Sequence, residues 1–321
     1  MQAQRATDVA TDLVMIARVD SEAPAILVRD LHKSYGAVEA VRGIDFEVAR
    51  GEVFGLLGPN GAGKTTTVEM LEGYRERTSG IVSVLGHDPA SRPRALRERV
   101  GIVLQSSGTY RHATVRELVT HWAGFYPAPR DVEEVIDLAG LRESEHVRAR
   151  RLSGGQARRL DFALALVGDP ELVFLDEPTT GFDPAARRAA WDTIRALADL
   201  GKTVLLTTHY LDEAQALCDR VAIVKDGRIL AVGAPAELGV GASSRYRVSW
   251  RTEAGELSTR ETDDPTALLH QLTSAALARG TGLADLSVTR PSLEDVYLEL
   301  TAEVDDAPAE PAASGRRRSR R

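Results

Sequence analysis

The chain has 321 residues, of which 43% are hydrophobic and 27% charged, which suits one large domain and a smaller one with soluble surfaces. Its net charge of −7 gives no basis for nucleic-acid binding by the body of the protein. Cys218 is the only cysteine in the sequence, which excludes an internal disulfide and favours a cytosolic setting. No apolar run approaches the roughly eighteen residues that a membrane-spanning helix needs.

The first part of the chain indicates an arm followed by two strands. Residues 1–24 are polar and lack the periodicity of a core element, so we expect a mobile N-terminal arm. Ile26–Arg29 is predicted to be a strand, and Ile44, Phe46 and Val48 alternate as on a half-buried one.

A glycine-rich loop then lies between a short apolar run at 52–57 and a segment at 65–71 that can form a helix. The loop reads Gly58-Pro59-Asn60-Gly61-Ala62-Gly63-Lys64-Thr65, with Thr66 after it. It fits the phosphate-binding pattern G-x-x-x-x-G-K-[ST], in which glycines let the backbone approach a phosphate and N–H groups bind it. We expect Lys64 to reach the β- and γ-phosphates and the Thr65 hydroxyl to ligate Mg²⁺. Because Asn60 is the only asparagine, the Asn-Lys-x-Asp motif of GTPases is absent and that class is excluded.

An inserted helical lobe is predicted at about residues 106–150. Before it, the sequence predicts a strand, a short helix and a strand, at Ile81–Leu85, Pro93–Arg99 and Val100–Leu104, ending at Gln105. Helices are then predicted at Val115–Tyr126 and Val132–Ala139. This helical stretch is too long for a simple crossover between strands, so we expect it to form a lobe of its own.

A second motif supplies the acids that the phosphate-binding loop lacks. Arg151–Gln156 precedes a helix, and the buried strand predicted at Leu172–Leu175 ends in Asp176 and Glu177. The carboxyl ends of parallel strands are where doubly wound sheets bind ligands. We expect Asp176 to hold Mg²⁺ through water, and Glu177 to polarise the attacking water in line with the leaving phosphate.

The remaining core elements are a helix at Pro184–Leu200, a strand at Val204–Thr207 that ends at His209, and hairpin strands at Val221–Val224 and Ile229–Val232. Beyond Pro235 the pattern weakens, and we expect a small α+β domain at 240–301. Residues 302–321 are rich in alanine, proline and acids and end in arginines, so we expect a disordered tail. The predicted fold class is α/β: a P-loop NTPase core with a mostly parallel sheet, an antiparallel β subdomain and the inserted helical lobe.

The order of the motifs resembles the ATP-binding cassette of ABC transporters. These motifs are Tyr35, Gly58–Thr65, Gln105, Leu152–Gln156 (LSGGQ), Leu172–Pro178 (LVFLDEP), Gly181-Phe182-Asp183 and His209. The resemblance covers about residues 26–235, and the LSGGQ signature is highly specific to that family. We therefore place the ATPase domain at 25–238. Phe182 departs from the leucine that is usual in the family, and it still fills an apolar position.

The resemblance implies roles for residues that spacing alone does not explain. Tyr35 would stack on adenine, Gln105 would sense the γ-phosphate, and His209 would contact it as a switch. Ser153 and the next two glycines would bind the γ-phosphate of the ATP held by another cassette. The expected ATP contacts are Tyr35, Gly58, Pro59, Asn60, Gly61, Ala62, Gly63, Lys64, Thr65, Thr66, Ser153, Gly154, Gly155, Gln156, Asp176 and Asp183. The expected catalytic residues are Lys64, Gln105, Glu177 and His209, and the expected Mg²⁺ site is Thr65, Gln105 and Asp176.

The resemblance also implies two kinds of protein partner. A second cassette, in a homodimer or in a pair with another cassette, would complete two shared ATP sites. A separate polytopic membrane subunit would bind a groove formed by the helical lobe, with Ser106–Ala113 as the expected contact. The chain would then lie at the cytoplasmic face of the cell membrane as a peripheral protein.

The end of the appended domain indicates the direction of transport. Pro291–Thr301 resembles the terminal segment of bacterial cassettes that export drugs, antibiotics or polysaccharides. The leading interpretation is thus the ATPase subunit of a bacterial exporter of a drug, antibiotic, lipid or polysaccharide. The alternatives are an importer-type ATPase and a soluble ATPase such as a cluster-assembly ATPase. The final arginines either meet anionic lipid headgroups or form a solvated tail without a function.

Overall fold

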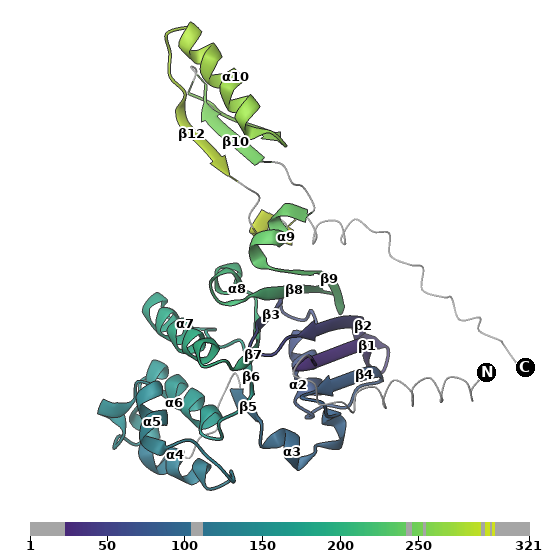
Figure 1. Ribbon diagram of the computed structural model, residues 1–321, viewed down its shortest axis with the longest axis vertical. Coiled ribbons are helices and arrows are strands. Elements are labelled where there is room, and N and C mark those ends of the chain that lie inside the picture. Colours follow the sequence, from purple (N-terminus) through teal and green to yellow (C-terminus); the bar gives the residue numbers. More distant parts are fainter. Residues whose placement is uncertain are drawn as a thin grey trace, which may run out of the picture. The chain divides into compact units, whose positions relative to one another are not determined.

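The computed structural model describes residues 23–103, 112–241, 246–252, 255–289, 293–295 and 297–298 (Figure 1). The chain divides into two compact units, Met1–Leu238 and Gly239–Arg321. Within the described residues, no helix combines the length and apolar character needed to cross a membrane. Residues 1–22 of the predicted arm at 1–24, the tail at 302–321, Gln105 and most of the expected contact Ser106–Ala113 lie outside the described residues.

The centre of the first unit is a six-stranded sheet with the order β5-β6-β7-β3-β8-β9. Its strands are β3 (Val53–Leu57), β5 (Val100–Val103), β6 (Leu172–Asp176), β7 (Thr203–Thr208), β8 (Arg220–Lys225) and β9 (Arg228–Gly233). All neighbouring strands are parallel except β8 and β9, which form the predicted hairpin. Strands β3 and β7 are buried along their whole length, because parallel strands are covered on both faces. The carboxyl ends of β3, β6 and β7 therefore lie side by side at one edge.

A second, antiparallel sheet has the order β2-β1-β4, with β1 at Ile26–Tyr35, β2 at Val38–Val48 and β4 at Ser79–Val84. The sequence placed the end of the first strand at Arg29, and this was wrong. The strand continues because an irregularity at Asp30, whose φ is 47°, restores Leu31 to the buried face. Helix α2 (Lys64–Leu71) contacts β2, β4 and β6, so it lies between the two sheets.

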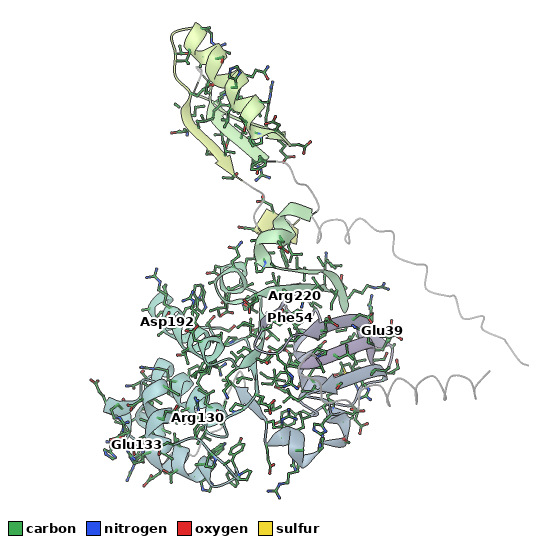
Figure 2. The ribbon with its side chains drawn as sticks, viewed as in Figure 1. Glu39, Phe54, Arg130, Glu133, Asp192 and Arg220 are labelled. Atoms are coloured by element: carbon green, nitrogen blue, oxygen red, sulfur yellow. The ribbon has the colours of Figure 1, made fainter. Side chains whose placement is uncertain are left out.

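Aromatic and cationic side chains join the two sheets. The rings of Phe46 on β2 and Phe54 on β3 stack with centroids 5.6 Å apart. Arg220 lies over the Phe54 ring at 5.5 Å and also pairs with Glu52 at 3.3 Å (Figure 2). The Arg220 guanidinium thus lies over the aromatic ring of Phe54 near the start of β3, and the carboxylate of Glu52 balances its charge.

The helical lobe consists of α4 (Val115–Ala123), α5 (Val132–Leu138) and α6 (Gly154–Leu166), which share one apolar cluster. Short 3-10 turns at Arg142–Ser144 and Ala149–Arg151 connect α5 to α6. Helix α4 ends at Ala123, three residues before the predicted end. Its start is fixed by a capping box between Thr114 and Glu117.

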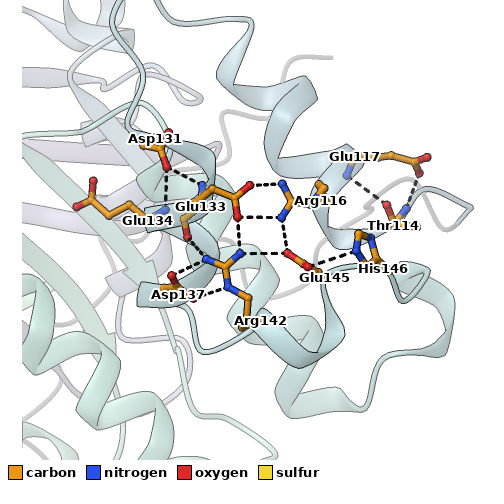
Figure 3. A network of polar contacts seen from close by, with 10 residues as sticks. All are labelled: Thr114, Arg116, Glu117, Asp131, Glu133, Glu134, Asp137, Arg142, Glu145 and His146. Atoms are coloured by element: carbon orange, nitrogen blue, oxygen red, sulfur yellow. Dashed lines mark hydrogen bonds and ion pairs between the residues drawn. The ribbon is translucent and has the colours of Figure 1, made fainter.

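An ion-pair network ties the lobe together on its surface (Figure 3). Arg116 on α4 contacts Glu133 on α5 and Glu145, and Arg142 contacts Glu133 and Asp137. The hydrogen bonds from Arg116 and then from Arg142 lower the pKa of Glu133 to about 2. The stabilisation is therefore complete above about pH 4.3, the ordinary pKa of glutamate, and is lost as the pH falls toward 2.

The remaining helices of the first unit frame the sheets. Those that the structure describes are the 3-10 turn η1 (Pro89–Ser91), α3 (Arg94–Arg97), α7 (Pro184–Asp199) and α8 (Leu211–Leu217), while α9 (Pro235–Gly241) continues from the first unit into the second. Helices α8 and α9 are absent from the sequence interpretation. Each has seven residues, too few to give a clear helical period.

The second unit contains a three-stranded antiparallel sheet with the order β11-β10-β12 and the helix α10 (Figure 1). Its elements are β10 (Tyr246–Arg251), β11 (Leu257–Thr262), α10 (Pro265–Ala278) and β12 (Ala284–Thr289). Val248 and Trp250 of β10 pack with Leu268 of α10 in its apolar core. Strand β12 was missed because all six of its residues are exposed, so it lacks a buried face.

Gly101 offers a test of how closely β5 packs on α6. A Cβ atom at this position would lie 2.5 Å from the carbonyl oxygen of Ala165 and 3.1 Å from a carbon of Pro170. Gly101→Ala should therefore destabilise the protein by about 1–3 kcal/mol, the usual cost of overpacking, measured by denaturant unfolding. Gly154→Ala is the matched control, because no atom lies within 4 Å of its added Cβ. Equal stability of the Gly101→Ala and Gly154→Ala variants would contradict this packing.

Candidate active site

The phosphate-binding loop joins β3 to α2 and depends on glycine at two close approaches. A Cβ atom at Gly58 would lie 2.1 Å from the carbonyl oxygen of Val224, on neighbouring β8. Gly63 has a φ of 99°, and a Cβ atom there would lie 2.5 Å from the carbonyl oxygen of Ala40. Glycine is therefore required both for the backbone conformation and for the space.

The loop encloses a pocket of about 370 Å³. It is lined by Ala40, Asn60, Gly61, Gly63, Lys64, Thr65, Thr66 and Glu177. The structure thus brings Glu177, from the end of β6, to the loop after β3. Ala62, within the loop, is buried, and the N–H of Gly227 donates a hydrogen bond to its carbonyl oxygen.

The Lys64 side chain is buried and lies at the centre of the loop. Its ammonium donates hydrogen bonds to the carbonyl oxygens of Gly58 at 2.7 Å and Pro59 at 3.0 Å. It also lies 3.9 Å from a carboxylate oxygen of Glu177. Burial lowers the pKa of Lys64 below its ordinary value, although the charges of Glu177 and Asp176 act in the opposite direction.

Thr65 and Asp176 form a pair of oxygen ligands. The Thr65 hydroxyl lies 3.5 Å from a carboxylate oxygen of Asp176, across the gap between α2 and β6. Thr207 of β7 donates a hydrogen bond to the same oxygen at 2.5 Å and fixes the carboxylate. Hydroxyl and carboxylate oxygens are what Mg²⁺ prefers, so the chemistry of this pair fits the predicted metal.

Glu177 is held in an unusual backbone conformation. Its φ is 44°, which is uncommon for a residue other than glycine, and its N–H donates to the Thr207 hydroxyl at 2.9 Å. Thr180 donates to one carboxylate oxygen at 3.0 Å, while the other lies 3.4 Å from Nδ1 of His209. Glu177 thus contacts Lys64 of the phosphate loop and His209 at the end of β7.

The signature residues lie at the start of α6 and do not line the phosphate pocket of their own chain. Ser153 is the helix cap, and Gln156 closes a capping box with it. The Gln156 amide also donates to the buried Ser144 hydroxyl at 2.9 Å. No atom lies within 4 Å of a Cβ built on Gly154 or Gly155. The start of α6 is therefore rigid and open.

Asp183 and Tyr35 lie apart from the residues that line the phosphate pocket. Asp183 caps α7 by accepting hydrogen bonds from the N–H groups of Ala185 and Ala186, both at 2.9 Å. The Tyr35 ring is 41% exposed at the end of β1. Its centroid is 5.0 Å from the ammonium of Lys33 and 5.3 Å from the guanidinium of Arg75. Two cations thus lie over the ring of this partly exposed tyrosine.

Sequence reasoning missed the residues that orient the site. Thr207 contacts both Asp176 and Glu177, and Ser144 holds Gln156. The sequence contains one indication of the role of Thr207, which is a polar residue at the end of an apolar strand. This strand pairs with β6, where Thr207 lies beside Asp176. The sequence contains no indication of the role of Ser144, because it lies in a short turn twelve positions before Gln156.

Comparison with known proteins gives one consistent family. The family described as ABC transporter matches residues 41–180. A Nod factor export ATP-binding protein I of Burkholderia lata is 40% identical over 85% of this chain and 95% of its own length. The daunorubicin/doxorubicin resistance ATP-binding protein DrrA of Streptomyces peucetius is 38% identical over 90% of this chain and 96% of its own.

A solved structure agrees with these relatives. The structure of cbiO1 from Clostridium perfringens, part of the ABC transporter complex cbiONQ, is 30% identical with a TM-score of 0.63. The match covers 68% of this chain and 92% of that one. The predicted cassette core is thereby confirmed, and the chain belongs to the ABC transporter family.

Proposed function

We propose that this chain is the ATP-hydrolysing subunit of a bacterial exporter, which energises transport through a separate membrane subunit. The observation that carries the proposal is the meeting of buried Lys64, Glu177 and the Thr65–Asp176 pair at one phosphate loop. The names of the relatives support export, since they describe Nod factor export and drug resistance. The cargo class is a drug, antibiotic, lipid or polysaccharide.

Each residue of the site has a part in hydrolysis. The β- and γ-phosphates of ATP bind the loop N–H groups and Lys64, whose ammonium exchanges the carbonyls of Gly58 and Pro59 for phosphate oxygens. Thr65 and Asp176 would hold Mg²⁺, which neutralises phosphate charge when bound. Asn60, Gly61 and Thr66 complete the loop contacts, and Gln105 is proposed as a further metal and γ-phosphate contact.

Glu177 positions the water that attacks the γ-phosphorus. The carboxylate oxygen near His209 accepts the proton of this water as its oxygen bonds to phosphorus, and the bond to the bridging oxygen of ADP breaks. The products are ADP and inorganic phosphate. Thr180 occupies the other carboxylate oxygen, and Thr207 fixes the backbone, so the base keeps one orientation. His209 contacts the γ-phosphate from the end of β7.

A second cassette completes the site. Ser153, Gly154 and Gly155 are exposed or partly exposed and do not line their own pocket, so they are suited to the ATP of another chain. Gln156 shapes this surface through Ser153 and Ser144. Asp183 lies at the start of α7, and Phe182 lines a small pocket with Gly155. A homodimer, or a pair with a different cassette, would hold two such ATP molecules.

The membrane subunit is the other proposed partner. Its contact is Ser106–Ala113, of which His112 and Ala113 are described, at the start of the helical lobe. Binding there would hold the chain peripherally at the cytoplasmic face of the membrane. Tyr35 would stack on adenine at the exposed end of β1.

The first prediction tests Glu177 as the base. Glu177→Gln should bind Mg-ATP normally but hydrolyse it about 10²–10⁴-fold more slowly, because an amide cannot take the proton from water. Steady-state phosphate release measures the rate, and a sizing column should show an accumulated ATP-bound dimer. Glu98→Gln is the matched control, since its carboxylate pairs with exposed Arg94, and it should turn over like the wild type. Near-normal turnover of Glu177→Gln would remove Glu177 from the mechanism.

A second prediction tests whether two chains share each site. Lys64→Ala and Ser153→Arg homodimers should both be inactive, because every site then carries a defect. A heterodimer of the two single variants has one site with both defects and one with neither. A doubly substituted chain paired with the wild type has one defect in each site. Vanadate-trapped nucleotide should therefore appear in the first heterodimer and be absent from the second. Equal trapping in both pairs would mean that Ser153 serves the nucleotide of its own chain.

A further inference from the structure

The imidazole of His209 lies beside Glu177 without a hydrogen bond to fix its Nδ1 atom. This atom is buried and makes no hydrogen bond within the described part of the chain. A carboxylate oxygen of Glu177 lies 3.4 Å away, so the two groups attract each other as an ion pair only when the histidine is protonated. The orientation of the imidazole ring therefore depends on the side chains that pack on it.

Tyr210, the next residue in the chain, packs on this imidazole. The ring centroids of His209 and Tyr210 lie 4.0 Å apart, and their planes are inclined by 41°. The N–H of Tyr210 donates to the hydroxyl of buried Thr208 at 2.9 Å, which ties the backbone here to the end of β7. Within the described residues the phenol hydroxyl makes no hydrogen bond, so the aromatic ring itself makes the contact with His209.

Arg187 of α7 holds the Tyr210 ring in turn. Its guanidinium lies over the ring, 4.4 Å from the centroid, and pairs with Asp212 at 3.3 Å. A cation over an aromatic ring is attracted by the negative face of the π system. The Nε atom of Arg187 is buried and makes no hydrogen bond within the part of the chain that the structure describes. Arg187, Tyr210 and His209 thus form a series of contacts that ends at Glu177.

A buried carboxylate fixes α7 one turn beyond Arg187. Glu213 of α8 is 1% exposed, and one of its carboxylate oxygens accepts two hydrogen bonds. The donors are the indole N–H of Trp191 on α7, at 3.1 Å, and the hydroxyl of Thr179, at 2.8 Å. Thr179 lies in the segment between β6 and α7. Helix α7 is thereby bound to α8 and to the segment that follows β6, so Arg187 projects from a firmly held helix.

We propose that Tyr210 is a positioning residue for ATP hydrolysis: its ring, held by Arg187, keeps the imidazole of His209 in the orientation that meets the γ-phosphate beside Glu177. The inference rests on the proposed function, because it assigns a support to the base and the histidine of that site. With Nδ1 toward Glu177, Nε2 is the ring nitrogen left for a phosphate oxygen. Tyr210 and Arg187 do not line the phosphate pocket, so their effect falls on the rate rather than on nucleotide binding.

Substitutions of Tyr210 test the role of the ring. Tyr210→Leu keeps an apolar side chain but removes the flat aromatic face. It should lower kcat for ATP hydrolysis at least about tenfold and change the Kd for Mg-ATP by less than about threefold, because a misplaced group slows the chemical step. Tyr210→Phe keeps the ring and should retain at least about half of the wild-type kcat. Steady-state phosphate release from the full chain and equilibrium nucleotide binding measure these values.

Arginine substitutions test the support of the ring. Arg187→Gln should lower kcat about two- to tenfold, because the cation over the Tyr210 ring is lost. Arg195→Gln is the matched control two turns further along α7. Its guanidinium lies over a different ring, 6.0 Å from the centroid of Trp191, and pairs with exposed Asp192 at 3.1 Å. The control should turn over within about 1.5-fold of the wild type.

A double-substitution cycle tests whether Tyr210 acts through His209. His209→Ala removes the imidazole that the tyrosine holds, so adding Tyr210→Leu should lower kcat by no more than about twofold further. Single-turnover reactions with excess protein keep these slow rates measurable. If Tyr210→Leu lowers kcat by the same factor with and without His209, the ring acts elsewhere and the inference is wrong.

The remaining outcomes separate this inference from the proposed function. Thermal unfolding is measured for every variant, and if Tyr210→Leu fails to fold, Arg187→Gln compared with Arg195→Gln decides the question. A wild-type kcat for Tyr210→Leu, or a kcat for Tyr210→Phe as low as that of Tyr210→Leu, would overturn the positioning role and leave the ATPase intact. Normal turnover by Glu177→Gln would overturn the proposed site, and the positioning role with it.

Discussion

One hydroxyl group, on Thr207, fixes the two acids of the candidate site. It donates to the carboxylate of Asp176 and accepts from the N–H of Glu177, so both acids are fixed by the strand beside them. Parallel pairing of β6 with β7 and of β7 with β3 brings these acids to the phosphate loop. The site therefore depends on strand order: without β7 between the other two, the acids and Lys64 would not meet.

The chain divides its chemistry between two surfaces. Lys64 and Glu177 share one pocket, whereas Ser153 and the two glycines after it lie outside that pocket at the start of α6. The ion pairs of Arg116 and Arg142 with Glu133 connect the elements of the lobe on its surface. Ser144, which follows Arg142 in the same short turn, accepts a hydrogen bond from the Gln156 amide at the start of α6. A surface that is ordered before binding loses little conformational entropy, which would favour the proposed assembly with a second cassette.

Helix α2 has a different pocket at each of its ends. Its first residues, Lys64 and Thr65, line the phosphate pocket, and Glu72 at its end lines a second pocket of about 460 Å³. Burial raises the pKa of Glu72 to about 8, and the negative charge of Asp176 acts in the same direction.

The sequence by itself determined the cassette core, the phosphate loop and the acids after β6, because these depend on local patterns: glycine spacing, an apolar run and the residues that end it. It could not determine β12, α8 or the continuation of β1, which have weak periods or none. The contacts of Thr207 and Ser144 with the site residues were likewise determined only by the tertiary structure. Their roles arise from neighbours distant along the chain, since a hydroxyl or carboxylate acquires its function from the groups that packing places within reach.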